Sequence, residues 1–162
     1  MSKHILIVSD SHGRNDNLRT IVKRFPHLDM MLHLGDSQCP NSELESIAGC
    51  PIEIVRGNCD WNSHNPSLRV FDIDGLRIFM THGHNYSVNY SLIRLVQAAR
   101  EQQASIAMFG HTHVPVIDEQ SGDVTVINPG SISQPRQEGH RPSFINMEID
   151  DYGVPHFNLG YL

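Results

Sequence analysis

The chain has 162 residues, of which 39% are hydrophobic and 19% charged, and its formal net charge is −6. This length is typical of one domain with a buried core, so we expect a single domain over residues 1–162. The negative charge argues against non-specific binding to nucleic acid or to an anionic membrane. Small phosphate substrates stay open, because the charge of a bound metal can outweigh a weak global field.

The cysteines and the N-terminal sequence predict the cellular compartment of the protein. Cys39, Cys50 and Cys59 are an odd number without the spacing of a disulfide framework, which favours a reducing compartment. The apolar run at residues 5–8 is too short for a signal peptide or a membrane span. We therefore expect a cytoplasmic protein with no membrane partner.

Strands and helices are expected to alternate in the first half of the chain. Apolar runs predict buried strands over residues 5–8, 30–36 and 52–58. Helical spacing predicts helices over residues 16–25, ended by Pro26, and 42–48. This βαβαβ order predicts a parallel sheet.

The second half is expected to be mostly β-structure. Residues 68–83 have the alternation of a hairpin that turns at Asp74-Gly75. A helix is predicted over residues 90–101, a strand over 105–110, and hairpins over 114–130 and 141–159. The order favours the α/β class, with two mixed β-sheets packed face to face and flanked by helices.

Polar side chains follow five of the predicted strands, each in a turn that contains glycine. Ligands bind beyond the carboxyl ends of strands in open α/β sheets, and glycines let the backbone approach a shared centre. We therefore expect these side chains to converge. They are Asp10, His12, Asp36, Asn58, His82, His84, His111 and His113.

All of these side chains except His84 are candidate metal ligands. Seven oxygen and nitrogen donors are too many for one tetrahedral zinc, and they suit two divalent ions that share a carboxylate. Mixed His and Asp ligation is open to Mn, Fe, Co, Ni or Zn. Two ions carry about +4 against about −2 from two aspartates, so the centre would attract hydroxide and a phosphoryl oxygen.

The ordered motifs "DSH", "GD", "GNCD", "THGH" and "GHTH" resemble those of the calcineurin-like metallophosphoesterases. The resemblance runs from Asp10 to about Arg136, and the small size and the "GNCD" form are similar to YfcE-type phosphodiesterases. It implies a four-layer α-β-β-α sandwich and two divalent ions, with Mn²⁺ as the first candidate. It also implies a metal-bridging hydroxide as the nucleophile.

The resemblance also implies a role for each ligand. One metal would be held by Asp10, His12 and His113. The other would be held by Asn58, His82 and His111, and Asp36 would bridge the two. The "NPGSIS" stretch, residues 128–133, resembles the turn that closes the family's site, and Arg136 shortly after it could bind a substrate phosphate.

One position departs from the family pattern. Larger members often carry a histidine after the asparagine of the third motif, where this chain has Cys59. A thiol is a poor general acid near neutral pH. Either another group protonates the leaving oxygen, with His84 as the candidate for this role and for a substrate contact, or the enzyme favours leaving groups that need little protonation. Asn58 is expected to contact the substrate and, with Asp36, to serve the catalytic centre.

The predicted function is metal-dependent hydrolysis of a small phosphate ester, more specifically of a diester. A monoester dianion needs more cationic or acidic groups than Arg136 and His84 provide. The alternative is a metal-binding, non-catalytic interaction scaffold, as in the retromer subunit of the same fold. A single-metal structural site is a third interpretation, and family habit suggests a homo-oligomer, either a dimer or a tetramer.

Three further residues have interpretations of their own. His33 lies within an apolar strand and is interpreted as a hydrogen-bonded core histidine. Asp60 either orients its loop or pairs with a ligand histidine. Trp61, in the loop over residues 60–68, either lines the cleft or packs against the protein.

Overall fold

The described residues of the computed structural model, 1–120 and 122–162, form two mixed five-stranded sheets. The first sheet has the order β10-β9-β1-β2-β3. Its strands are β1 (Lys3–Val8), β2 (Met30–His33), β3 (Ile52–Ile54), β9 (Ser143–Ile149) and β10 (Pro155–Tyr161). β1, β2 and β3 are parallel, as the βαβαβ order predicts, and β9 pairs antiparallel with both β1 and β10.

The second sheet has the order β4-β5-β6-β8-β7. Its strands are β4 (Leu68–Ile73), β5 (Leu76–Thr81), β6 (Ile106–Met108), β7 (Val116–Asp118) and β8 (Thr125–Asn128). β4 and β5 form the predicted hairpin, whereas β5, β6 and β8 are parallel. β7 and β8 pair antiparallel, and Ser121 in their connection lies outside the described residues.

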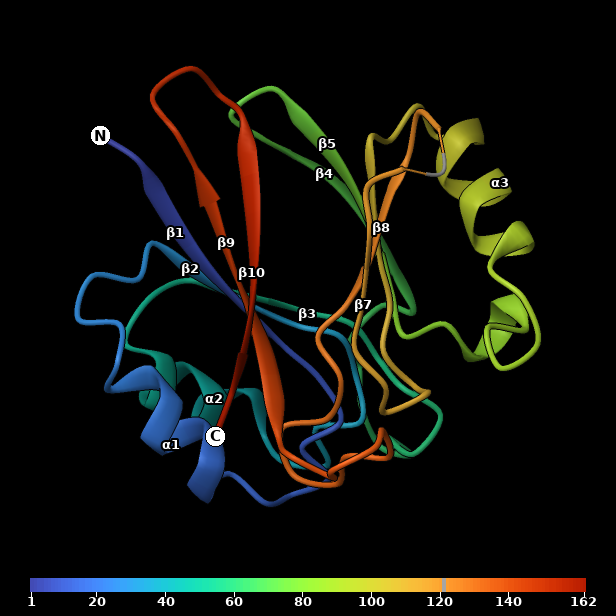
Figure 1. The fold of residues 1–162 in the computed structure, drawn as a ribbon. Helices are drawn as coiled ribbons and strands as arrows, with labels where there is room; N and C mark the ends of the chain where they lie inside the picture. Colours follow the sequence, from blue (N-terminus) through green and yellow to red (C-terminus); the bar gives the residue numbers. More distant parts are fainter. Residues whose placement is uncertain (121) are drawn as a thin grey trace.

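Helices cover the outer face of each sheet. α1 (Asp16–Val22) and α2 (Asn41–Ala48) lie against the sheet of β1, and α3 (Ile93–Glu101) lies against the other sheet (Figure 1). This is the four-layer α-β-β-α arrangement that the motif resemblance implies. No helix in the described part of the chain is long and apolar enough to cross a bilayer.

Alternation along the central strands explains the layers. In β1, Ile5 and Ile7 pack in the core between the two sheets, whereas Leu6 and Val8 pack with α1 and α2. In β5, Ile78 faces the same inter-sheet core. Successive side chains of a strand point to opposite faces, so a strand buried on both faces has a continuous apolar run.

Two helices are shorter than predicted. The helix expected over residues 16–25 ends at Val22, and the N–H groups of Arg24 and Phe25 bond in turns to carbonyls three residues back. Pro26 disfavours α-helical backbone only in Phe25, so the earlier end at Val22 reflects these tighter turn hydrogen bonds. The helix expected from residue 90 begins at Ile93, whose N–H donates to Ser91 Oγ at 3.1 Å.

Candidate metal centre

The predicted ligands meet where the strands of both sheets end. Asp10 and His12 follow β1, Asp36 follows β2, and Asn58 follows β3. From the second sheet, His82 follows β5 directly, and His111 and His113 follow β6. Figure 1 shows the connections after β1, β2 and β3 gathered with those of the second sheet at one end of the sandwich. The structure therefore brings together the side chains that the strand-end pattern predicted to converge.

The backbone at this end is strained at five of these residues. Asp10, His12, Asp36, His111 and His113 have φ values of 54°, 49°, 56°, 68° and 61°. Left-handed backbone is costly for residues other than glycine and persists only where the surroundings impose it, commonly at functional sites. The turns are thus held in conformations that direct their side chains inward.

Asp10 presents one unpaired oxygen to the centre. Its Oδ2 accepts hydrogen bonds from Ser9 Oγ and from the backbone N–H of His111. Its Oδ1 is buried without a hydrogen-bond partner, 3.1 Å from His113 Nε2 and 3.7 Å from His82 Nε2. An unpaired buried carboxylate oxygen is costly unless a cation or donor completes it.

Asp36 lies between histidines from different motifs. Its Oδ1 accepts from the backbone N–H of Cys59 at 2.7 Å. Its Oδ2 lies 3.1 Å from His82 Nε2 and 3.9 Å from His12 Nε2. The His82 contact lacks hydrogen-bond geometry, so this buried ring nitrogen is also without a hydrogen-bond partner.

Three histidines are oriented by oxygen acceptors on the side away from the centre. Donation from Nδ1–H to such an oxygen leaves Nε2 unprotonated and facing the carboxylates, which is the usual outer arrangement around metal-binding histidines. The Nδ1–oxygen pairs are His12 with Gln38 Oε1 at 2.7 Å, His82 with the Leu34 carbonyl at 2.6 Å, and His113 with the Gln134 carbonyl at 2.7 Å.

His111 is turned the other way. Its Nδ1 lies 3.0 Å from Asn58 Oδ1, and its Nε2 lies 3.1 Å from the side-chain amide of Asn89. The amide of Asn89 can present its oxygen to an Nε2–H, because both amide orientations have the same shape. In that tautomer, Nδ1 and Asn58 Oδ1 offer two lone pairs to one point, as cation ligands do.

The carboxylates and imidazoles shift one another's protonation. Burial opposes ionisation of Asp10 and Asp36, but nearby histidine charge outweighs it, together with the hydrogen bonds from Ser9 to Asp10 and from Cys59 N–H to Asp36, and lowers the pKa of both carboxyls. Burial also opposes protonation of His82, yet Asp36 and Asp10 raise the pKa of His82 above its usual value. Without a cation, these shifts favour ionised Asp10 and Asp36 and the protonated form of His82.

The residues present fit divalent cations. Three groups of ligand atoms each lie within 4.8 Å of one another: Asp10, His12 and His113; Asp10, Asp36 and His82; and His12, Asp36 and Cys59. The first group is the set that the resemblance assigns to one metal. The orphaned Asp10 Oδ1 and His82 Nε2 are the atoms that a cation would complete.

Asp60 holds two of the ligand loops together. Its Oδ2 accepts from the N–H groups of Asp36 and Gly57, both at 2.8 Å, and its Oδ1 accepts from Gln38 N–H at 2.9 Å. A Cβ on Gly57 would collide with Asp36 Oδ1, so glycine is required there. The interpretation of Asp60 as a loop-orienting residue is confirmed.

The turn over residues 128–133 fastens the loops after β1 and β6. Ser131 Oγ donates to the Asp10 carbonyl at 2.8 Å, and Ser133 Oγ donates to the Ser11 carbonyl at 2.8 Å. Asn128 Nδ2 donates to the Gly110 carbonyl at 3.0 Å. This segment holds the ligand loops through hydrogen bonds to their backbone, and it contributes none of the predicted ligands.

Two of the three predicted substrate contacts, His84 and Arg136, lie at the edge of the centre. His84 begins the short 3₁₀-helix η1 (His84–Tyr86), and its ring centroid lies 5.5 Å from that of His82. Burial and the His82 charge lower the pKa of His84, so this ring is mostly neutral near pH 7. Arg136 has an exposed side chain, and its backbone N–H donates to the His113 carbonyl at 3.0 Å.

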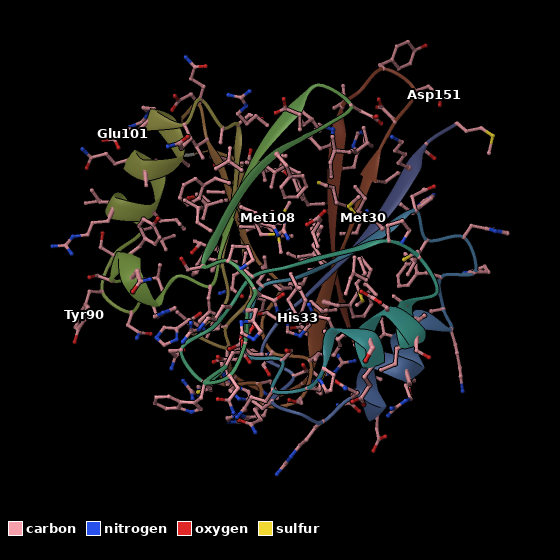
Figure 2. The ribbon with its side chains drawn as sticks, turned by 180° about the vertical axis from the view of Figure 1, so that it is seen from behind. Met30, His33, Tyr90, Glu101, Met108 and Asp151 are labelled. Atoms are coloured by element: carbon pink, nitrogen blue, oxygen red, sulfur yellow. The ribbon has the colours of Figure 1, made fainter. Side chains whose placement is uncertain are left out.

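His33 lies beneath the centre and is not a ligand candidate. Its Nδ1 accepts from Gly35 N–H at 3.1 Å, and its Nε2 lies 2.9 Å from Ser11 Oγ. Burial lowers the pKa of His33 to about 4, although Asp10 and Asp60 oppose the shift. The interpretation of a hydrogen-bonded core histidine is therefore confirmed, and Figure 2 shows His33 deep within the fold.

Sequence reasoning missed the groups that orient the histidines. Gln38, Asn89 and the Gln134 carbonyl lie in loops and belong to none of the five motifs. Arg56 was also missed, although its charge acts on His84. Only their closeness to the motifs in the sequence could have indicated these residues, since Gln38 follows "GDS" and Arg56 directly precedes "GN".

Comparison with known proteins places the chain in a family. Residues 4–152 match the model of the calcineurin-like phosphoesterase superfamily domain, and the chain belongs to this superfamily. It is 36% identical to the probable metallophosphoesterase YsnB of Bacillus subtilis over 134 residues, which cover 82% of this chain and 77% of YsnB. It is 34% identical to the phosphodiesterase YfcE of Escherichia coli over 105 residues, 60% of this chain and 52% of YfcE.

Solved structures confirm the fold. A predicted phosphoesterase from Streptococcus pneumoniae superimposes with a TM-score of 0.83 at 33% identity, covering 100% of this chain and 90% of its own. Vacuolar protein sorting 29 from Cryptosporidium parvum superimposes with a TM-score of 0.77 at 20% identity, covering 99% of this chain and 98% of its own. The second similarity is one of fold alone. The resemblance to calcineurin-like and YfcE-type enzymes is thus confirmed.

Proposed function

We propose that this protein is a phosphodiesterase that uses two divalent metal ions. The observation that carries the proposal is the buried, unpartnered Asp10 Oδ1 beside His113 and His82, with Asp36 between His82 and His12. A bound cation would complete these unpartnered carboxylate and imidazole atoms. The name of its relative YfcE supports diester chemistry.

We assign the ligands as the motif pattern does. Asp10, His12 and His113 would hold one ion, Asn58, His82 and His111 would hold the other, and Asp36 would bridge them. When bound, two ions would supply a hydroxide nucleophile and neutralise the charge that develops on the phosphoryl oxygens. Mn²⁺ is our first choice, and Fe, Co, Ni and Zn suit the same donors.

The remaining polar groups would serve the substrate. The Asn58 amide and the Arg136 guanidinium can donate to phosphoryl oxygens. Burial and Asp36 raise the pKa of the Cys59 thiol, so it stays protonated and weakly acidic. His84 would act as an acid only after an anionic phosphate beside it favours its protonated form. This scarcity of acids and cations favours diesters.

The test is hydrolysis of bis-p-nitrophenyl phosphate and p-nitrophenyl phosphate by metal-stripped protein, with and without added Mn²⁺. We expect cleavage that depends on the metal and is faster for the diester. Cleavage without metal, or a clear preference for the monoester, would contradict the proposal.

The competing function is a metal-binding scaffold without catalysis. The fold shared with vacuolar protein sorting 29 is compatible with it. Every predicted ligand position here carries a ligand-competent side chain, which favours catalysis. Metal-loaded protein that cleaves neither ester would favour the scaffold, and a metal content of about one ion per chain would favour a single-metal structural site.

Three broader assignments accompany the proposal. We propose that residues 1–162 form one phosphoesterase domain that assembles as a dimer or tetramer. All three cysteines are free, which supports a reducing compartment and a cytoplasmic location. Sedimentation or light scattering would measure the oligomeric state directly.

A further inference from the structure

A cleft of about 580 Å³ opens beside the candidate metal centre. Its walls are two loops, residues 37–41 and 59–65. Gln38 and Cys59 belong both to the cleft and to the centre: Gln38 orients His12, and Cys59 Sγ lies within 4.8 Å of the ligand atoms of His12 and Asp36. A group bound in the cleft can therefore be attached to a phosphate at the centre.

Hydrogen bonds between the two loops fix the shape of the cleft. The side-chain amides of Asn41 and Asn65 bond to each other in both directions, at 2.7 and 3.0 Å. The Asp60 carboxylate ties the loop of residues 59–65 to Gln38 N–H at 2.9 Å. A cleft that is formed in advance loses little entropy when a ligand enters it, and its volume is typical of small-molecule sites.

Trp61 presents an unusual surface within this cleft. It is the only tryptophan in the chain, and its side chain is 81% exposed. An exposed indole gives up the free energy that burying it would provide. A flat aromatic group of a ligand would recover part of that free energy by stacking on the indole face.

The rest of the lining favours a neutral ligand with polar edges. No lysine or arginine lines the cleft, whose lining does include His64 and Asp60, so a second phosphate finds no guanidinium or ammonium group there. Six of the twelve lining residues carry side-chain amides or hydroxyls, and these donate to and accept from the edges of heterocycles. These polar side chains are Ser37, Gln38, Asn41, Asn62, Ser63 and Asn65.

We propose that this cleft binds the nucleobase of a small nucleoside phosphodiester, stacked on Trp61, while the phosphate occupies the metal centre. The inference rests on the proposed function and names the substrate class for it. The negative net charge disfavours long nucleic acid, so the substrate would be a single nucleoside ester.

The first test compares two diesters with the same leaving group, thymidine 5′-(p-nitrophenyl phosphate) and methyl p-nitrophenyl phosphate, in the Mn²⁺-loaded enzyme. Trp61→Ala should raise KM for the thymidine ester about tenfold, with kcat little changed, since stacking contributes to ground-state and transition-state binding alike. The methyl ester should respond within about twofold. Equal effects on both esters, or no effect on either, would overturn the proposal.

Two variants serve as controls. Trp61→Phe keeps an aromatic face and should restore most of the thymidine preference. Tyr152→Ala removes another highly exposed aromatic side chain, 92% exposed, in the turn between β9 and β10. That turn lies at the opposite end of the sandwich, as neighbouring Asp151 shows in Figure 2, so Tyr152→Ala should leave both kinetic constants unchanged.

A binding measurement separates this inference from the proposed activity. Because Trp61 is the sole tryptophan, its fluorescence reports ligands in the cleft of the wild-type protein. Adenosine 5′-monophosphate should quench it saturably, and ribose 5-phosphate should not. This result would support the cleft even if no diester is hydrolysed. Absence of saturable quenching would overturn the cleft assignment even if diesters are hydrolysed.

Discussion

At the scale of single residues, the centre is defined by two buried polar atoms that lack hydrogen-bond partners. Asp10 Oδ1 and His82 Nε2 are both buried, 3.7 Å apart, and neither has a hydrogen-bond partner. The neighbouring carboxylates raise the pKa of His82, and the histidines lower the pKa of Asp10. A bound cation would replace the imidazole proton as the positive charge between these carboxylates.

Metal binding should therefore release protons. His82 carries a proton below its raised pKa, and it must lose it to become a ligand. We expect this proton release to appear as a buffer-dependent heat in calorimetry of Mn²⁺ binding, measured in buffers of different ionisation enthalpy. The release should fall as the pH rises through the raised pKa. Binding heat that does not depend on the buffer would contradict this account.

His33 predicts an acid-sensitive stability. Its pKa is lowered to about 4, so between that value and about pH 6.5 the unfolded chain binds a proton that the folded protein excludes. Stability should fall as the pH falls through this window. From about pH 7 to about pH 4.5, metal-free wild-type protein should lose about 2 kcal/mol more than His33→Gln, by urea unfolding. Equal losses in both proteins would contradict the prediction.

At the scale of elements, the strand ends position the predicted ligands, and the loops supply the groups that orient the ligand histidines. The sequence predicted the five strand ends because buried runs followed by Gly with Asp, Asn or His have a clear pattern. Helix ends were predicted less well, since the shortening after Val22 depends on turn hydrogen bonds. The partners of the ligand histidines, such as Gln38 and Asn89, come from loops whose paths are set by tertiary contacts.

Asp60 is the loop contact whose removal should be most visible. The two carboxylate oxygens of Asp60 together accept from Asp36 N–H, Gly57 N–H and Gln38 N–H. Asparagine has only one acceptor oxygen, so Asp60→Asn cannot keep all three hydrogen bonds. We expect a loss of about 2 kcal/mol in unfolding free energy and metal binding weakened about tenfold or more, measured by denaturation and by metal titration.

Asp123→Asn is the matched control for this change. Asp123 pairs with Arg100 on the surface, away from the ligand loops. Exposed ion pairs contribute little to stability, so this variant should unfold and bind metal like the wild type. An Asp60→Asn protein that also behaves like the wild type would show that the loops do not depend on the carboxylate.

At the scale of the whole molecule, the two sheets are brought together by one apolar core. Ile7 of β1 and Met80 of β5 pack in the same inter-sheet cluster, and their strands end at ligand loops. The centre therefore forms only when both sheets dock. The parallel start of the first sheet and the layers were predictable from the apolar runs, the element order and the motif resemblance. The order of strands within each sheet was not predicted, and neither was the cleft beside Trp61, which depends on how two loops pair.

The central claim is that these strand ends hold two catalytic ions, and a metal titration of turnover tests it most directly. Metal-stripped protein would receive increasing Mn²⁺ while hydrolysis of bis-p-nitrophenyl phosphate is followed and bound metal is counted. We predict that turnover reaches its maximum at two ions per chain and that Asp36→Asn lowers it about a hundredfold or more, beyond the loss caused by outer-shell changes. Saturation at one ion, or full turnover in Asp36→Asn, would contradict the claim.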